Sequence, residues 1–302
     1  MPTRVTLTVS DLDRAERFYT ETLPFQTQDR YDLPTEVARP LFGLSDRNAR
    51  AEVLVLQLGD EAIELQQFHG AAPATPIPAD SRSNDLWFQH IAMVVTDMER
   101  AYAPLWEARV QHVSTAPQTL PDYLPNAAGI AAFYFRDPDG HNLELIQFPE
   151  GVGQDRWHAD DAPLYAGIDH TAIGIARTAR SLEFYEKLGF EIAGESENHG
   201  TEQEHLNQVF GARLLITNLA DGDPVNLELL DYIAPPGGRP YPADAAPTDL
   251  IHWHTHVRTQ HAAELFEQFP GKKISTEVVE WNGSDCFLGR DLDGHALLFS
   301  GM

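Results

Sequence analysis

The chain has 302 residues, and its 46 Asp and Glu residues against 21 Lys and Arg residues give a formal net charge of −25. This charge excludes a nucleic-acid partner, because a phosphate backbone repels it. No stretch approaches the ~18 consecutive apolar residues of a membrane span, and the N-terminus lacks the apolar run of a secretory signal. The single cysteine, Cys286, excludes an intrachain disulfide and a cysteine-clustered metal site. We therefore expect a cytoplasmic protein without nucleic-acid or membrane partners.

The second half of the chain repeats the first. The stretch PIPADSRSNDLWFQH (76–90) resembles PYPADAAPTDLIHWH (240–254), and RDPDGH (136–141) recurs as RDLDGH (290–295). Repeats of this kind indicate duplicated structural units. We predict an N-terminal domain, 1–150, and a C-terminal domain, 166–302. Each holds two modules, at 1–68 and 86–148 in the first domain and at 168–232 and 250–302 in the second.

The first module opens with a short strand and a helix. Asp11 is the expected N-cap of this helix, and Leu12, Ala15 and Phe18 form its apolar face. The module closes with EVLVLQL-GDE-AIELQQF (52–68), in which Gly and Asp between two apolar runs indicate a β-hairpin.

The second module has the same plan. Its predicted helix has apolar residues at the spacing i, i+3, i+4 and i+7, namely Met98, Ala101, Tyr102 and Leu105. It closes with the hairpin AAFYFR-DPDG-HNLELIQF (131–148), where Glu144 interrupts an apolar strand. A carboxylate on that face is costly to bury unless a charge or hydrogen bond compensates for its lost hydration.

The third and fourth modules repeat this order. Their predicted helices carry Leu182, Tyr185 and Leu188 in the third module, and Ala262, Leu265, Phe266 and Phe269 in the fourth. The hairpins are RLLITNL-ADGDP-VNLELLDY (213–232) and CFLGR-DLDG-HALLFSG (286–301). Each module therefore reads strand–helix–strand–strand–strand, which is an α+β arrangement.

The motifs HIAMVVTDMERAY (90–102) and FYFRDPDGHNLELIQF (133–148) resemble those of the vicinal oxygen chelate superfamily, the glyoxalase, bleomycin-resistance and extradiol-dioxygenase group. The resemblance covers nearly the whole chain, in a four-module form. It implies four βαβββ modules that pair into two open, cup-shaped barrels around a divalent metal. It also implies ligands from the first and last strand of each module. Four modules can complete their own cups, so we expect a monomer or a homodimer.

The ligand positions follow from this register. The first-strand position holds Arg4, His90, His170 and His254 in the four modules, and the last-strand position holds Glu64, Glu144, Glu228 and Leu298. Pairing the second module with the third gives one complete site of two His and two Glu residues. Such a set suits one divalent Zn, Ni, Co, Mn or Fe(II) ion, and the resemblance implies that it is close to the glyoxalase I ligand set. The remaining modules would form a degenerate site, with an ion pair between Arg4 and Glu64.

A second pairing stays open at this point. If neighbouring modules pair, as in extradiol dioxygenases, two three-ligand sites result: Glu64, His90 and Glu144, and His170, Glu228 and His254. The residues His252, His254 and His256 alternate along a strand and share a face, so a further metal site there is a second alternative. We adopt the single complete site as the interpretation.

The expected function is a glyoxalase-like metalloenzyme, of lyase or isomerase type, acting on a small oxygenated substrate. The metal would stabilise an enediolate, and Glu144 or Glu228 would act as general base. A ring-cleaving dioxygenase with Fe(II) or Mn(II) is an alternative, although Asn126 stands where the dioxygenase signature has a His. A non-enzymatic drug- or antibiotic-binding protein is the other alternative, because Arg4 and Leu298 show that ligand positions have been lost.

Overall fold

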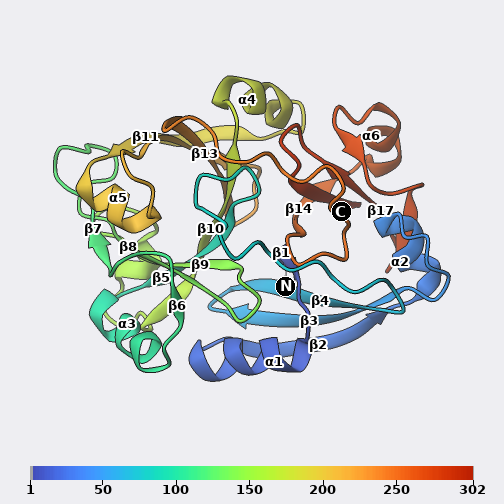
Figure 1. Ribbon diagram of the computed structural model, residues 1–302, viewed down its shortest axis with the longest axis horizontal. Coiled ribbons are helices and arrows are strands. Elements are labelled where there is room, and N and C mark those ends of the chain that lie inside the picture. The colour runs from blue at the N-terminus through green and yellow to red at the C-terminus, as the bar shows by residue number, and fades with distance from the viewer. Residues whose placement is uncertain (1–2, 302) are drawn as a thin grey trace.

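A computed structural model describes residues 3–301. It contains two mixed β-sheets of nine strands each, and most of the helices pack on the outer faces of these sheets (Figure 1). One sheet has the order β15-β17-β18-β14-β1-β4-β3-β2, with β16 paired to β17, and the other has the order β11-β12-β13-β10-β5-β9-β8-β6, with β7 paired to β8. Within residues 3–301, no helix has both the length and the apolar character needed to cross a membrane.

Each sheet takes one module from each half of the sequence. The first module contains β1 (Thr3–Thr8), α1 (Leu12–Arg17), a π-helical turn (Phe18–Thr22), β2 (Gln26–Leu33), α2 (Thr35–Phe42), β3 (Arg50–Leu58) and β4 (Glu61–His69). The fourth, which shares its sheet, contains β14 (Trp253–Thr259), α6 (Ala262–Gln268), β15 (Lys272–Lys273), β16 (Val279–Trp281), β17 (Ser284–Arg290) and β18 (Ala296–Gly301). The two modules join where β1 runs antiparallel to β14.

The second and third modules form the other sheet. The second contains β5 (Gln89–Val95), α3 (Met98–Glu107), β6 (Gln111–His112), β7 (Gln118–Thr119), β8 (Ala131–Arg136) and β9 (Asn142–Gln147). The third contains β10 (Tyr165–Ile175), α4 (Thr178–Glu186), β11 (Glu191–His199), α5 (Thr201–Asn207), β12 (Arg213–Ala220) and β13 (Asn226–Ala234). They join where β10 runs antiparallel to β5. The pairing of the second module with the third is therefore confirmed. The alternative, in which the first module pairs with the second and the third with the fourth, is wrong.

In every module the first strand lies parallel to the last. The parallel pairs are β1 with β4, β5 with β9, β10 with β13, and β14 with β18. This confirms the βαβββ modules and the open, cup-shaped sheets. The modules depart from the simple pattern in two ways, because α2 and α5 are extra helices in the first and third, and short strands replace one long strand in the second and fourth.

The helices begin where the sequence indicates. The side chains of Asp11 and Asp97 accept hydrogen bonds from the backbone N–H groups of Arg14 and Arg100, at 2.8 and 3.0 Å, and cap α1 and α3. The extra helix α2 ends at Gly43, whose φ of +61° is the left-handed conformation common after a helix C-terminus.

The core lies on the helix-covered faces of the sheets. Ile91, Met93 and Val95 alternate with cup-facing residues along β5 and are buried in a cluster formed mainly by the first two modules. A second cluster, which includes Phe184 and Phe287, is formed by the last two modules. The convex faces thus pack within each half of the sequence, whereas the concave faces are shared between halves.

The two hairpins of sequence RDxDGH form hydrogen bonds between neighbouring modules. Asp137 accepts hydrogen bonds from the backbone N–H and the ring Nδ1 of His141, at 2.9 and 2.8 Å, and from the hydroxyl of Tyr19 in the first module at 3.3 Å. Asp291 likewise accepts a bond of 2.9 Å from the Tyr185 hydroxyl, which reaches it from the third module. The turns are hairpins, as the sequence predicts, and they also tie neighbouring modules.

Candidate metal centre

Strand register brings three of the expected ligands to one point in the cup of the second and third modules. Glu144 on β9 lies opposite Ala92 of β5, so its side chain shares a face with His90, two residues earlier on β5. On the antiparallel neighbour β10, Ala172 lies opposite His90, and His170 shares the face of Ala172. One ligand atom from each of His90, Glu144 and His170 lies within 4.8 Å of the other two.

The separations are short and all three residues are buried. The Nε2 atoms of His90 and His170 are 3.1 Å apart. Glu144 Oε2 lies 2.9 Å from His90 Nε2 and 3.5 Å from His170 Nε2. Despite these contacts, Glu144 Oε2 makes no hydrogen bond of acceptable geometry within the described chain. The three atoms therefore converge on one small region.

Glu228 stands at the edge of this group. It lies on β13, opposite Ala172 of the parallel strand β10, and its Oε2 is 3.3 Å from His170 Nε2. Its side chain is 16% exposed, against 4% for Glu144. The structure therefore brings together His90, Glu144, His170 and Glu228, with Glu228 nearest to solvent.

One neighbour fixes the orientation of a histidine. Asp169 Oδ2 lies 2.7 Å from His170 Nδ1, so Nδ1 donates to the carboxylate and Nε2 is the nitrogen turned toward the cluster. A carboxylate behind a histidine is a frequent outer partner of metal ligands. Sequence reasoning missed Asp169, because an acidic residue before a histidine carries no signal of its own. The His90 ring is held differently, between the rings of Tyr134 and Phe88.

The cluster perturbs the proton affinities of its members. Burial alone would raise the pKa of Glu144, but the close His170 and His90 rings outweigh it and lower this pKa to about 2. Burial raises the pKa of Glu228 to about 7, and the nearby Asp169 and Glu144 carboxylates add to this effect. Burial lowers the pKa of His90. For His170 burial acts in the same direction, but the carboxylates of Glu228, Asp169 and Glu144 outweigh it and raise its pKa well above 6.5.

These residues fit a divalent cation. Ligand atoms about 2.0–2.2 Å from one ion lie roughly 3–3.5 Å from one another, and the four separations in the cluster run from 2.9 to 3.5 Å. The donors are imidazole nitrogens and carboxylate oxygens, the set that Zn, Ni, Co, Mn and Fe(II) accept. An unbonded carboxylate oxygen buried between two histidine nitrogens is otherwise unfavourable.

The cluster opens into a cavity of about 760 Å³. Its wall from the second module is largely apolar and includes Leu120, Ile130, Ala132, Ile146 and Phe148. Its wall from the third module is polar and includes Ser196, Asn198, Gln203, Asn218 and Asn226. Asn126 lies at the cavity too, and its side-chain amide donates to the backbone carbonyl of Glu195 at 2.9 Å.

The remaining candidates lie in the other sheet. Glu64 accepts hydrogen bonds from the hydroxyls of Thr6 and Tyr31, at 2.9 and 3.2 Å. The nearest histidine nitrogen that pairs with it belongs to His256, at 3.8 Å, rather than to His254. Glu64 and His254, the ligands that the alternative pairing would add, are thus separated from the cluster at His90.

The expected ion pair between Arg4 and Glu64 is wrong. A shift in strand register between Thr3 and Val5 interrupts the alternation of β1 at this residue. The Arg4 guanidinium instead meets Asp221, in the β12–β13 turn, at 2.9 Å, and donates to the His256 carbonyl at 2.8 Å. A bulge of this kind leaves no mark in the sequence.

The histidines of β14 do share a face, as alternation predicts. The rings of His252 and His254 are 5.5 Å apart and those of His254 and His256 are 5.2 Å apart. Burial lowers the pKa of each below the ordinary value, well below it for His252 and His254. Over residues 3–301, the one group of three His, Cys, Asp or Glu residues with ligand atoms close enough for a metal is His90, Glu144 and His170.

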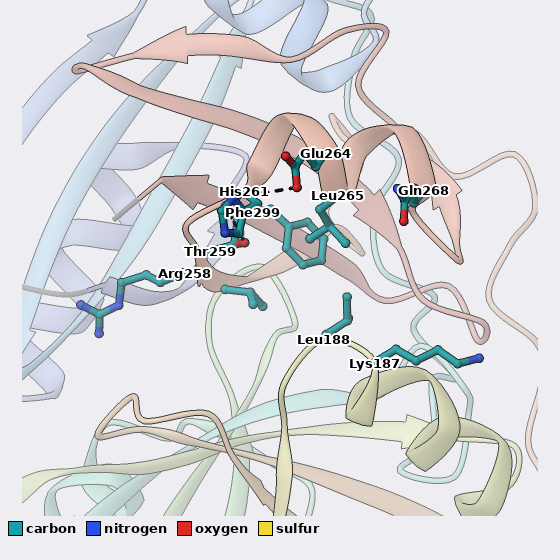
Figure 2. A pocket seen from close by; sticks show the side chains of 10 residues that line it. Lys187, Leu188, Arg258, Thr259, His261, Glu264, Leu265, Gln268 and Phe299 are labelled. Carbon is teal, nitrogen blue, oxygen red and sulfur yellow. Dashed lines mark hydrogen bonds and ion pairs between the residues drawn. The ribbon is translucent and has the colours of Figure 1, made fainter.

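A smaller hollow of about 260 Å³ lies far from this cluster, between the end of α4 and α6. Figure 2 shows that its labelled side chains come from two modules and include the ion pair of His261 with Glu264, at 3.9 Å. Its ionic groups lie at the surface, and we assign it no chemistry.

Comparisons with known proteins agree with this geometry. The model of the glyoxalase/bleomycin resistance protein/dioxygenase superfamily matches residues 2–145 and 167–297. A 2-epi-5-epi-valiolone epimerase from Actinomyces sp. is 32% identical over 153 residues, which cover 49% of this chain and 79% of that protein. The structure of glyoxalase I from Zea mays superposes with a TM-score of 0.63 at 18% identity, covering 98% of this chain and 90% of that one.

A putative dioxygenase from Bacillus subtilis has a TM-score of 0.58 at 13% identity, covering 100% of this chain and 86% of that one. These two structures share the fold of this protein, and the family model spans both halves of its sequence. The chain therefore belongs to the glyoxalase/bleomycin resistance protein/dioxygenase superfamily.

Proposed function

We propose that this protein is a divalent-metal-dependent enzyme of isomerase type, which moves a proton at a carbon next to a carbonyl group. The observation that carries the proposal is the buried convergence of His90, Glu144 and His170 at the floor of a large cavity, with Glu228 beside them. The relative named as an epimerase supports isomerase rather than lyase chemistry.

His90, Glu144, His170 and Glu228 would hold the metal. A bound divalent cation supplies Lewis-acid chemistry, in which it polarises a carbonyl oxygen and stabilises negative charge that develops there. Two buried histidines and a carboxylate fix this position at the cavity floor. The apolar wall from the second module excludes water on one side of a bound substrate.

Glu228 is the better placed of the two carboxylates to move the proton. It is more exposed to the cavity than Glu144, and without an ion burial raises its pKa to about 7, so it accepts a proton more readily than Glu144 does. Glu144, with a pKa near 2, stays ionised and keeps its position between the histidines. The carboxylate of Glu228 therefore takes the proton from the carbon and returns it.

The first test measures metal content by plasma mass spectrometry. We expect about one ion per chain in the wild type, its loss in His90→Ala and its retention in His254→Ala, which removes a buried histidine from the other sheet. Wild-type protein that holds no metal after reconstitution with any of the five candidate ions would overturn the proposal.

The second test measures chemistry. Dihydroxyacetone in D2O, followed by proton NMR, should exchange its carbon-bound hydrogens faster with the metal-loaded wild type than with Glu228→Gln. Oxygen consumption with a catechol would instead identify a dioxygenase. Tight ligand binding with neither exchange nor oxygen uptake would identify a binding protein.

A further inference from the structure

The polar wall of the cavity contains acceptor atoms without partners. The side-chain oxygens of Asn198, Gln203 and Asn218 are buried and make no hydrogen bond within the described chain. Asn198 and Gln203 are only 4% and 1% exposed. A buried amide oxygen without a donor is unfavourable, so three of them on one cavity wall indicate that the wall is built to receive donors.

These three side chains come from separate elements and lie on the same side of the cavity. Asn218 on β12 stands directly opposite Glu228 in the antiparallel pair with β13, so it lies beside the proposed base. Asn198 is near the end of β11, and Gln203 is on α5. The wall therefore begins at the cluster and extends away from it.

Hydrogen bonds to other side chains fix the amide group of Gln203. Its side-chain N–H donates to Oδ1 of the Asn207 side chain, and Nδ2 of Asn207 donates to the Tyr232 hydroxyl at 2.7 Å. These bonds engage the amide nitrogen of Gln203, whose oxygen has no partner within the described chain. The extra helix α5 thus contributes a fixed acceptor that a simple βαβββ module lacks.

The charge of the cavity excludes other classes of ligand. None of the described residues that line it is Lys or Arg, whereas Glu144, Asp169, Glu195 and Glu228 all line it. Away from the proposed metal centre, a substrate that carries a carboxylate, phosphate or glutathione group would meet no Lys or Arg side chain there. Hydroxyl groups satisfy both needs, since each can donate to an amide oxygen and carries no charge.

We propose that the substrate is an uncharged compound with several hydroxyl groups, whose O–H groups donate to Asn198, Gln203 and Asn218 while its carbonyl end lies at the His90–Glu144–His170 cluster. This inference rests on the proposed function for the position of the carbonyl. The hydrogen-bond and charge arguments for the polar wall are independent of it.

The test compares three ring ketones by isothermal titration calorimetry with zinc-loaded protein. 2-Hydroxycyclohexanone offers the chelating oxygens alone, scyllo-inosose adds further hydroxyls, and 3-dehydroquinate adds a carboxylate. We expect scyllo-inosose to bind at least about tenfold more tightly than either other ring, since two or more hydrogen bonds are gained. Equal affinity for the inosose and the hydroxycyclohexanone, or a preference for the dehydroquinate, would overturn the inference.

Matched variants then locate the effect. Asn218→Leu and Gln203→Met keep the side-chain shape, and each should weaken scyllo-inosose binding about fivefold while 2-hydroxycyclohexanone binding is unchanged. Gln66→Met, which alters a buried amide in the other sheet, should change neither. Equal loss for both rings would count against the wall as the specificity determinant. The wild-type comparison needs no variant, so it decides the question even if a variant fails to fold.

Failure of the proposed metal-dependent function would give a different result from failure of this inference. His90→Ala should abolish zinc-dependent binding of every ring. If wild-type affinities are the same with and without zinc, yet scyllo-inosose is still preferred and Asn218→Leu removes the preference, the polar wall stands and the metal role does not.

Discussion

At the scale of single residues, the informative feature is a carboxylate that interrupts an apolar strand. Glu144 lies in a run of leucines and isoleucine on β9, where its burial is unfavourable by itself. The structure resolves this through His90 and His170, whose nitrogens lie close enough to hold its charge. The burial of Glu144 is therefore explained only by the two histidines, which come from the strands β5 and β10.

Replacement of this carboxylate should separate metal binding from folding. Glu144→Gln keeps the shape of the side chain but removes its charge, and we expect metal affinity to fall by at least about 100-fold. Competition with a metal-sensitive dye measures the affinity, and a thermal melt of the metal-free protein checks the fold. Unchanged affinity would show that Glu144 is not a ligand.

Metal binding should release protons at neutral pH. A histidine must be unprotonated to act as ligand, and the pKa of His170 is raised well above 6.5 in the absence of an ion. At pH 7 this ring holds a proton that the metal must displace, and Glu228, with a pKa of about 7, holds part of another. Affinity should therefore fall as the pH is lowered. Calorimetry in buffers with different ionisation enthalpies counts the protons, and a count of zero at pH 7 would contradict this account.

At the scale of elements, the RDxDGH hairpin does more than reverse the chain. His141 places one ring nitrogen 2.8 Å from the Asp137 carboxylate and the other 2.9 Å from the Leu250 carbonyl, so both nitrogens donate and the ring is charged. Burial opposes this charge, but Asp137 outweighs burial and raises the pKa of His141. The hairpin thus carries a buried ion pair that spans to the segment before β14.

Breaking this pair should destabilise the fold in a pH-dependent way. Asp137→Asn should lower the free energy of unfolding by about 3 kcal/mol, because it leaves a buried charge without its partner. Since the folded pKa of His141 is raised, its contribution is complete below about pH 6.5 and is lost as the pH rises through the folded value. The difference between wild type and variant in urea unfolding should therefore shrink at alkaline pH.

Asp291→Asn is the matched comparison for this experiment. Asp291 occupies the same place in the second hairpin and binds Tyr185, but within residues 3–301 no ion pair joins it to His295. Its effect on stability should vary less between pH 6 and pH 9. An equal pH dependence of the two variants would show that the charge of His141 is not responsible.

Elements were easier to predict than contacts. The α3 face and the four hairpins follow from apolar spacing and turn residues, which are local properties of the chain. The extra helices α2 and α5 lie in segments that the second and fourth modules lack, so a unit common to all four modules did not predict them. Asp169 and Gln203 act through neighbours brought together by folding, and the displacement of Arg4 results from a bulge; nothing in the local sequence marks these.

At the scale of the whole molecule, the concave faces combine opposite halves of the chain (Figure 1). His90 and Glu144 come from the N-terminal half, and His170 and Glu228 from the C-terminal half. All four first-strand positions share similar surroundings, so the sequence alone left the pairing of modules open. The antiparallel contact of β5 with β10 decides it.

Separating the halves should therefore divide the site. Residues 1–150 and 166–302 produced as separate chains should each bind metal weakly, because each supplies two of the four ligands. Mixed together, they should recover about one ion per pair of chains, with an affinity that depends on protein concentration. Strong binding by either half alone, at the wild-type stoichiometry, would contradict the shared site.

The segment between β9 and β10 joins the two halves of the chain covalently. Two separate but identical halves would associate symmetrically, and any substitution in the gene would then appear in both cups at once. In one continuous chain a substitution appears once, so one cup can lose its ligands while the other keeps them. Covalent joining thus allows Arg4 and Leu298 to occupy ligand positions in one sheet while two His–Glu pairs remain in the other.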